Sequence, residues 1–160
     1  MGMPSVLSLW NTSTRLPRGN RLFSIAFARK APYFATIRPR FTELRPHHAE
    51  LVIPKRRRVH NHIGTVHAIA LCNGLEAAMG ALAEATIPRD QRWIPKGMTV
   101  TYTAKATSDI TCIAETDPEQ WGAEALPETG GDVAVRVRGL REDGEVVIEG
   151  EIRLWVTPKR

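Results

Sequence analysis

The sequence has few of the features that mark disulfide-rich or membrane-spanning chains. Its two cysteines, Cys72 and Cys112, lie in apolar runs far apart, which predicts free buried thiols in a reducing compartment rather than a disulfide framework. No stretch of about 18 residues is free of polar breaks, and no basic segment precedes the first apolar residues, so we expect neither a spanning helix nor a signal peptide. The sequence therefore predicts a soluble, cytoplasmic protein.

Aromatic residues are also scarce, at 6% of the chain, and none lies between Phe41 and Trp93. Nucleic-acid-binding modules usually interleave aromatic side chains with basic ones for stacking, so we expect no nucleic-acid partner. The chain has 160 residues, of which 42% are hydrophobic and 24% charged. These values are typical of one ordinary globular domain.

Acidic residues are nearly missing from the first part of the chain. Residues 1–58 contain 12 Lys and Arg against two acids, Glu43 and Glu50, for a net charge of +10, whereas residues 59–160 contain 10 against 15, and the whole chain carries +5. Such a basic block suits partners that bear phosphate, including a nucleotide-tailed cofactor or an anionic membrane surface.

The first thirty residues read as two short helices, from Pro4 to about Thr14 and from Asn20 to about Lys30, which form an N-terminal helical extension (residues 1–30). From Tyr33 to Thr42, and again over residues 49–53, apolar and polar residues alternate with the period of a strand. We therefore expect two strands, joined by a turn at residues 44–46 and followed by a polar loop at residues 55–58.

Residues 66–87 form the longest apolar segment. They predict a helix that is buried on most sides, with Thr65 as its N-cap and Pro88 beyond its end. Four strand-like runs follow, at residues 98–106, 110–114, 133–138 and 146–156. The sequence thus predicts a single α+β domain (residues 31–160), in which a curved antiparallel sheet of about six strands wraps a long central helix. A sheet of this kind leaves an edge to be covered, so we expect a homodimer or a dimer of dimers.

Glu76 is the most informative residue of the predicted central helix. No basic residue lies between positions 66 and 87 to neutralise it, and burial of a bare carboxylate raises its pKa and is costly. Such a group usually serves as a base or is hydrogen-bonded across an interface. The alternative is a side chain that reaches solvent through a thin gap.

Residues 61–67, Asn-His-Ile-Gly-Thr-Val-His, precede the helix. Helix N-termini present free backbone N–H groups that bind an oxyanion or a phosphate, and Gly64 would permit close approach of a ligand. The alternative is that Asn61 simply forms an Asx turn in a loop. The five histidines fall between His47 and His67. The pair His60 and His62 lacks the spacing of a zinc site and leads into a loop without an acidic companion, so we expect no metal.

The stretch from Asn61 to Glu76 resembles the motif of hotdog-fold acyl-CoA thioesterases. It is closest to the phenylacetate-degradation (PaaI) type and to thioesterase-like proteins resembling the C-terminal domain of YiiD. The resemblance extends, less specifically, over roughly residues 20–156. It implies the hotdog fold and hydrolysis of an acyl-CoA to a free acid and coenzyme A, with no cofactor other than the coenzyme A of the substrate.

The resemblance also implies roles for individual residues. Glu76 would activate water or attack the thioester carbonyl, Asn61 would orient the water or the carbonyl, and the backbone N–H of Ala68 would polarise the carbonyl oxygen. In related enzymes the Asn and the acid come from different subunits. Two positions depart from the pattern: His-Gly-Gly becomes His67-Ala68-Ile69, and a serine of some relatives becomes Ala104.

Several alternatives remain for the basic residues and for the reaction. Two basic sets are candidates for holding the nucleotide phosphates of coenzyme A: Arg56, Arg57 and Arg58, and Arg136 and Arg138. His62, fourteen positions before Glu76, resembles the histidine of acyl-carrier-protein dehydratases, so a hydratase or dehydratase is one alternative. A non-catalytic acyl-CoA-binding module is another. We expect no membrane insertion in either case.

Overall fold

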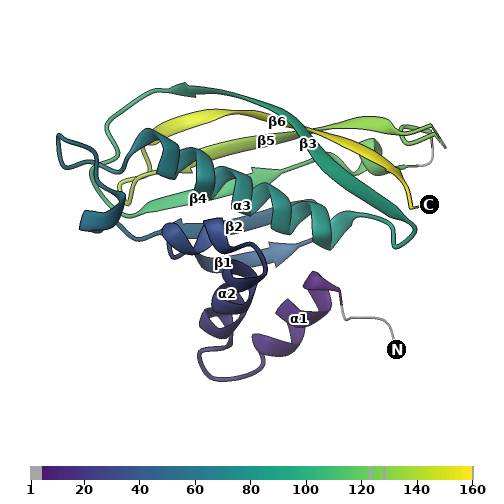
Figure 1. Ribbon diagram of the computed structural model, residues 1–160, viewed down its shortest axis with the longest axis horizontal. Helices are drawn as coiled ribbons and strands as arrows, with labels where there is room; N and C mark the ends of the chain where they lie inside the picture. Colours follow the sequence, from purple (N-terminus) through teal and green to yellow (C-terminus); the bar gives the residue numbers. More distant parts are fainter. Residues whose placement is uncertain (1–4, 123, 128, 160) are drawn as a thin grey trace.

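A six-stranded antiparallel sheet curves around one long helix (Figure 1). The structure, a computed structural model, describes residues 5–122, 124–127 and 129–159. The strands lie in the order β1-β2-β4-β5-β6-β3. Their bounds are Arg40–Arg45 (β1), His48–Ile53 (β2), Gln91–Tyr102 (β3), Ile110–Glu115 (β4), Gly131–Leu140 (β5) and Val146–Pro158 (β6).

The central helix, α3 (Ala68–Thr86), packs mainly on β2 and β4. Four of its alanines, Ala77, Ala78, Ala81 and Ala83, are fully buried, and a side chain at Gly74 would lie only 2.3 Å from Ile53 Cδ1 of β2. Small residues thus let helix and sheet approach closely. Within the described residues, α3 is the one helix long and apolar enough to cross a membrane. It is the core helix of this fold, since 61% of its apolar window is buried.

Two helices precede the sheet, α1 (Val6–Ser13) and α2 (Gly19–Lys30), and both lie below β1 in Figure 1. They confirm the expected helical pair, although Pro4 lies outside the described residues. Trp10 and Phe23 belong to the same core cluster as the sheet and α3. The helices are thus packed onto the domain, and the division near residue 31 stays a prediction.

The structure confirms the predicted order of strands and central helix but corrects three boundaries. The predicted strand from Tyr33 is wrong: residues Pro32–Thr36 form a 3-10 helix, η1, because Pro32 favours a helical first turn and Arg38 (φ 50°) then reverses the chain. The N-cap of α3 is His67, not Thr65. β3 begins at Gln91, well before the expected residue 98, and runs for 12 residues.

Candidate active site

The loop before α3 is closed by Asn61. Its side-chain oxygen accepts hydrogen bonds from the amides of Ile63 and Thr65, each at 3.1 Å, and its Nδ2 donates to Thr65 Oγ1 at 2.8 Å. Gly64 has φ +79° with open space where a Cβ would be, so the turn conformation, not close approach of a neighbour, calls for glycine there. The alternative of an Asx turn is what the structure shows for Asn61.

The first turn of α3 carries two free amides. His67 Nδ1 accepts a hydrogen bond from the amide of Ile69 at 3.1 Å, which in the neutral imidazole places the proton on Nε2. Among the described residues, no hydrogen bond uses the amide of Ala68 or that of Ala70. These donors stand at the positive end of the helix, where a developing oxyanion is stabilised.

One side of α3 faces β3 along a line that we call the α3–β3 seam. It is formed by a row of helix residues, Cys72, Glu76, Gly80 and Glu84, and by the inward residues of β3, Trp93, Met98, Val100 and Tyr102. Cys72 Sγ lies 3.3 Å from Tyr102 Oη at one end of the seam. At the other end, Trp93 Nε1 donates to Glu84 Oε1 at 3.0 Å.

Glu76 lies between these two contacts, one turn beyond Cys72. It is half-buried, which is less burial than the sequence suggests, and no hydrogen bond or ion pair among the described residues involves its carboxylate. The β3 residues between the two contacts, Met98 and Val100, are apolar and partly buried against the core, so this part of the seam has an apolar wall. An unpaired carboxylate against an apolar wall is available to accept a proton or to attack a carbonyl carbon.

The helix geometry separates Glu76 from the free amides. Glu76 is eight positions after Ala68 along α3, which corresponds to about 12 Å of helix axis. A single chain therefore does not bring the Ala68 N–H and the Glu76 carboxylate onto one carbonyl group. The two groups meet on one substrate only if a second chain supplies one of them.

The basic set at residues 56–58 lies directly before this loop. Arg57 and Arg58 are exposed in η2 (Arg57–Val59), and Arg56 Nη2 donates to the carbonyl of Thr36 at 2.5 Å. The pKa of Arg56 is lowered by burial and by the charges of Arg38 and Arg58. This cluster of like charge would gain from a bound anion.

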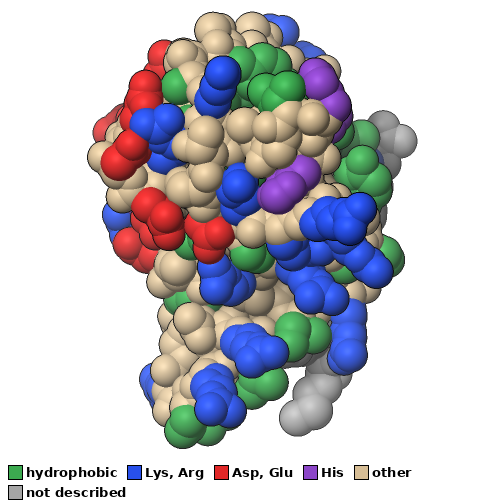
Figure 2. All heavy atoms as spheres, turned by 90° about the vertical axis from the view of Figure 1, so that its left-hand side faces the viewer, with side chains coloured by type: hydrophobic (Ala, Val, Ile, Leu, Met, Phe, Trp, Pro, Cys, Tyr) green, Lys and Arg blue, Asp and Glu red, His purple; other side chains and the backbone are tan. Residues whose placement is uncertain are grey.

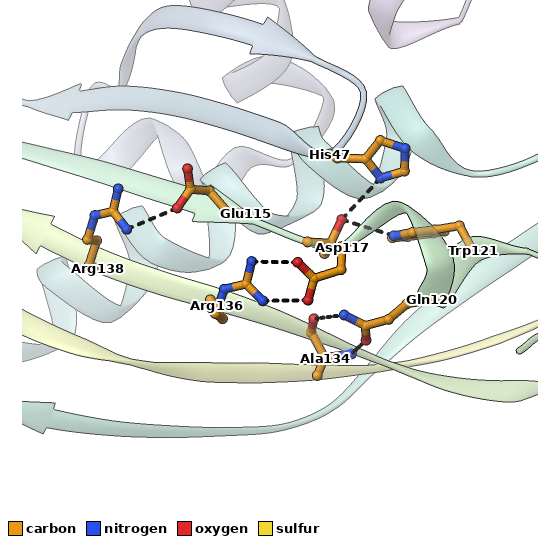
Figure 3. A network of polar contacts seen from close by, with 9 residues as sticks. His47, Glu115, Asp117, Gln120, Trp121, Ala134, Arg136 and Arg138 are labelled. Atoms are coloured by element: carbon orange, nitrogen blue, oxygen red, sulfur yellow. Dashed lines mark hydrogen bonds and ion pairs between the residues drawn. The ribbon is translucent and has the colours of Figure 1, made fainter.

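Arg136 and Arg138 lie elsewhere, on the face of the sheet that turns away from α3. Figure 3 shows Arg136 in a bidentate pair with Asp117, at 2.7 and 2.9 Å, and Arg138 pointing to Glu115, at 2.9 Å. The Arg136 side chain lowers the pKa of Asp117 through these bonds. The structure does not bring this pair to the Arg56–Arg58 set, and its contact with phosphate stays a prediction.

Sequence reasoning missed the β3 half of the seam and the exposed edge of the sheet. Three large apolar side chains are exposed on this side: Ile94 (61%) and Tyr102 (49%) on β3, and Ile69 (55%) on α3. The alternation of Met98, Val100 and Tyr102 predicts a strand, but nothing in it shows which helix face the strand meets. Both cysteines are free, as expected, and burial raises the pKa of Cys112 far above its usual value.

The long helix wrapped by an antiparallel sheet defines a hotdog-fold protein, as the motif resemblance implied. Residues 19–156 match the family model described as a domain of unknown function (DUF4442), and the chain belongs to that family. The assignment to the PaaI or YiiD type stays a prediction.

Several solved structures resemble most of the chain, among them APC5556 and PA5026. The structural-genomics protein APC5556 is 42% identical, with a TM-score of 0.81, covering 96% of this chain and 99% of that one. PA5026 from Pseudomonas aeruginosa, described as a probable thioesterase, is 24% identical, with a TM-score of 0.77 and coverage of 90% and 97%.

The fold also extends to more distant proteins. HI1161 from Haemophilus influenzae, described as a thioesterase, is 9% identical, with a TM-score of 0.66 and coverage of 79% and 82%. No curated protein matches the chain.

Proposed function

We propose that this chain is a homodimeric acyl-CoA thioesterase. The observation that carries the proposal is the unpaired carboxylate of Glu76, held in the α3–β3 seam of a fold whose α3 N-terminus offers free amides. The names of fold neighbours such as PA5026 and HI1161 support the reaction class.

The proposed reaction uses two groups at two stages. The carboxylate of Glu76 takes a proton from water, and the hydroxide attacks the thioester carbonyl carbon; alternatively, Glu76 attacks directly and water then cleaves the anhydride. The carbonyl oxygen gains negative charge, which the amide of Ala68 and the helix dipole stabilise. The carbon–sulfur bond then breaks, and coenzyme A leaves as a thiol after protonation.

The proposed dimer forms across the open edge of β3. A 12-residue edge strand with exposed Ile94 and Tyr102 is a template for pairing with a second copy. Pairing there would bring the Ala68 amide of one chain toward the Glu76 of the other. A shared site of this kind is needed because the two groups lie about 12 Å apart along the helix of a single chain. The Nδ2 group of Asn61 donates one of its two hydrogens to Thr65. Its second hydrogen would donate to the substrate on the same side as the Ala68 amide.

Arg56, Arg57 and Arg58 are the proposed phosphate-binding set for coenzyme A. They precede the 61–67 loop, and Arg57 and Arg58 have no carboxylate partner among the described residues. Phosphate groups prefer such arginine clusters because each guanidinium donates two parallel hydrogen bonds.

The test is a steady-state assay of thiol release from short-, medium- and long-chain and aromatic acyl-CoAs, with Glu76→Gln beside the wild type. We expect a loss of about a hundredfold or more in kcat, as for removal of a general base. Glu149→Gln, at an exposed position of β6, is the matched control and should be fully active. Equal turnover by the Glu76→Gln and wild-type proteins would refute the proposal.

Nothing in the described residues favours the dehydratase or the binding module. His62, the residue on which a dehydratase depends, is exposed in the loop. Hydration of an enoyl thioester, followed by loss of its absorbance, would nevertheless identify that activity in the same experiment. Saturable acyl-CoA binding without any turnover would instead identify a binding module.

A further inference from the structure

A separate cluster of metal-ligand side chains lies at the β1–β2 hairpin, on strand positions that face away from α3. Glu43 of β1 and His48 and Glu50 of β2 each offer one ligand atom, and the three atoms lie within 4.8 Å of one another. Glu43 and Glu50 are directly opposite in the strand register. Like charges in that position destabilise a strand pair, so a cation between them would remove a repulsion.

The imidazole of His48 points into this cluster. Its side chain is only 10% exposed, and Nδ1 lies 3.3 Å from Glu115 Oε1. Nε2 is buried without a hydrogen-bond partner, 3.6 Å from Glu43 Oε2. When Nδ1–H donates to Glu115, the Nε2 lone pair faces a carboxylate oxygen, and only a proton or a metal ion between them makes that contact favourable.

In each of the three side chains, a polar atom also contacts a neighbouring side chain, which fixes its orientation. Arg45 Nε donates to Glu43 Oε1, and Thr42 Oγ1 donates to Glu50 Oε1, each at 2.7 Å. Glu115, which faces His48 Nδ1, is itself held by Arg138 at 2.9 Å, as Figure 3 shows. Metal sites are built in this way, with a second hydrogen-bonded group behind every ligand.

We propose that Glu43, His48 and Glu50 bind a divalent transition-metal ion, with Zn²⁺ as the test ion. One imidazole and two carboxylates are ligands that zinc accepts, and water would complete its coordination. A proton on His48 Nε2 would form a hydrogen bond with one of the two carboxylates and leave the repulsion between Glu43 and Glu50 in place. A divalent ion would contact all three ligands. The site would tie β1 to β2 and is separate from the proposed hydrolytic reaction.

The test uses the full chain, freed of metal with a chelator and titrated with ZnCl₂ by calorimetry and by thermal unfolding. We expect saturable binding of one ion per chain and, at about a hundredfold excess over Kd, a rise in Tm of roughly 5–10 °C. His48→Gln and Glu50→Gln should each weaken binding at least about tenfold. His62→Gln, an exposed histidine outside the site, should leave it unchanged.

Three results would overturn the metal site: no saturable binding, binding that survives both variants, or binding lost in His62→Gln. If His48→Gln fails to fold, Glu50→Gln decides alone, because Glu50 is only half-buried whereas His48 is buried. Since acyl-CoA hydrolysis is measured separately, failure of the metal site leaves the proposed activity standing.

A second, independent feature is the basic surface of the N-terminal helices. Five arginines line a groove of about 960 Å³ between α2 and β1: Arg18, Arg21, Arg29, Arg38 and Arg40. No acidic side chain lines it, and within the described residues Arg40 alone of the five has a carboxylate partner, Asp109, at 2.7 Å. In the lower part of Figure 2, Lys and Arg side chains mix with hydrophobic ones, whereas the acids gather higher up.

Aliphatic side chains of α1, of α2 and of the turn between them are unusually exposed, and one of them, Ile25, lines the groove. They are Leu9, Leu16, Leu22 and Ile25, with exposures between 43% and 56%. The aromatic rings of α2 instead pack inward on Phe41, so they offer no platform for stacking bases. Arginine mixed with exposed leucine and isoleucine is the composition of helices that lie on anionic bilayers.

We infer that this surface docks on a bilayer of anionic phospholipid, with headgroup phosphates in the arginine groove. The test is co-sedimentation of the whole protein with vesicles of phosphatidylcholine alone or with added phosphatidylglycerol. We expect binding only to the anionic vesicles. The Arg18→Gln/Arg21→Gln/Arg29→Gln variant should bind about a hundredfold more weakly, and Leu22→Ser/Ile25→Ser roughly tenfold more weakly.

Arg153→Gln is the matched control, because Arg153 is exposed on β6 and has no ion-pair partner among the described residues. Equal binding to neutral vesicles, no binding to either kind, or equal losses in the triple variant and in Arg153→Gln would each overturn the inference. Binding to an acidic protein or a nucleic acid but not to vesicles would overturn it as well.

Discussion

The two edge strands of the sheet differ in how they are covered. At the β1 edge, α2 packs against the strand, and Ser24 Oγ accepts a hydrogen bond from the Phe41 amide at 2.9 Å. At the β3 edge, no helix of the described part of the chain covers the strand, and Ile94 and Tyr102 are exposed. The chain therefore covers one edge itself and leaves the other open, where the proposed second copy would pair.

The open edge is also the edge next to the candidate active site. Glu76 faces β3, and the free amide of Ala68 begins the same helix. The closed edge carries the basic groove and none of the proposed catalytic groups. Changes at the β1 edge should therefore alter folding, whereas changes at the β3 edge should alter assembly and activity.

The largest expected change is loss of stability when the closed edge loses its central ring. Phe41 is fully buried, with its ring 4.9 Å from that of Phe27 and 5.3 Å from that of Phe23. Phe41→Ala should lower the free energy of unfolding by about 3–5 kcal/mol, measured by denaturant unfolding. Tyr33→Ala, at a residue 66% exposed, is the control, and equal losses in the two variants would contradict the closed-edge interpretation.

A proline at position 68 should stop the reaction without unfolding the protein. Ala68 is the first residue of α3, its amide has no hydrogen bond, and His67 before it has ψ 140°, so proline fits both residues. Loss of an oxyanion donor costs about 10²–10³ in kcat. Ala68→Ser keeps the N–H and should stay within a few-fold of wild type, whereas full activity of Ala68→Pro would remove this amide from the mechanism.

Lysines on the open edge should separate the proposed dimer. Ile94 and Thr99 are exposed on β3, and charged edge residues prevent strand pairing. The Ile94→Lys/Thr99→Lys variant should be monomeric by light scattering and lose about a hundredfold in activity, as when one group of a shared site is missing. Thr107→Lys, in an exposed loop, should stay dimeric. A fully active monomer would refute the shared site.

Mixing two inactive variants sharpens the same comparison. If one chain supplies the Ala68 amide and the other Glu76, an Ala68→Pro/Glu76→Gln heterodimer has one intact site. Random reassortment of equal amounts then restores about a quarter of wild-type activity, measured after mild dissociation and remixing. If both groups acted within one chain, the mixture would stay inactive.

The fold was predictable where the sequence has a clear hydrophobic periodicity. The apolar run at 66–87 predicted the central helix, and alternating residues predicted the succession of strands along the chain, because burial on one face leaves a period in the sequence. Residues 33–38 alternate as well, but Pro32 and the left-handed Arg38 override the pattern with a 3-10 turn. His67 was missed as N-cap because Thr65 is a more common capping residue.

The site was predictable only in part. Glu76 stands out in sequence because no basic residue accompanies it, and the α3 N-terminus is an anion site in any helix. The partners across the seam, Trp93 and Tyr102, depend on the angle at which α3 crosses β3, which local sequence does not encode. The Glu43–His48–Glu50 cluster depends on hairpin register in the same way.

The smallest expected effect is a titration that reports on the open edge itself. The pKa of Tyr102 is raised to about 12, first by the hydrogen bond with Cys72, then by burial. Because the unfolded tyrosine titrates near 10, this contribution to stability is present below about pH 10 and is lost between about pH 10 and 12. Cys72→Ala should lower the pKa of Tyr102. The change would be seen as phenolate absorbance that appears at lower pH in a Tyr33→Phe background, where Tyr102 is the one remaining tyrosine.

A second copy paired on β3 would bury Tyr102 further and raise its pKa again. The dimeric wild type should therefore titrate at higher pH than the monomeric Ile94→Lys/Thr99→Lys variant, and identical curves would mean that the β3 edge is open in solution.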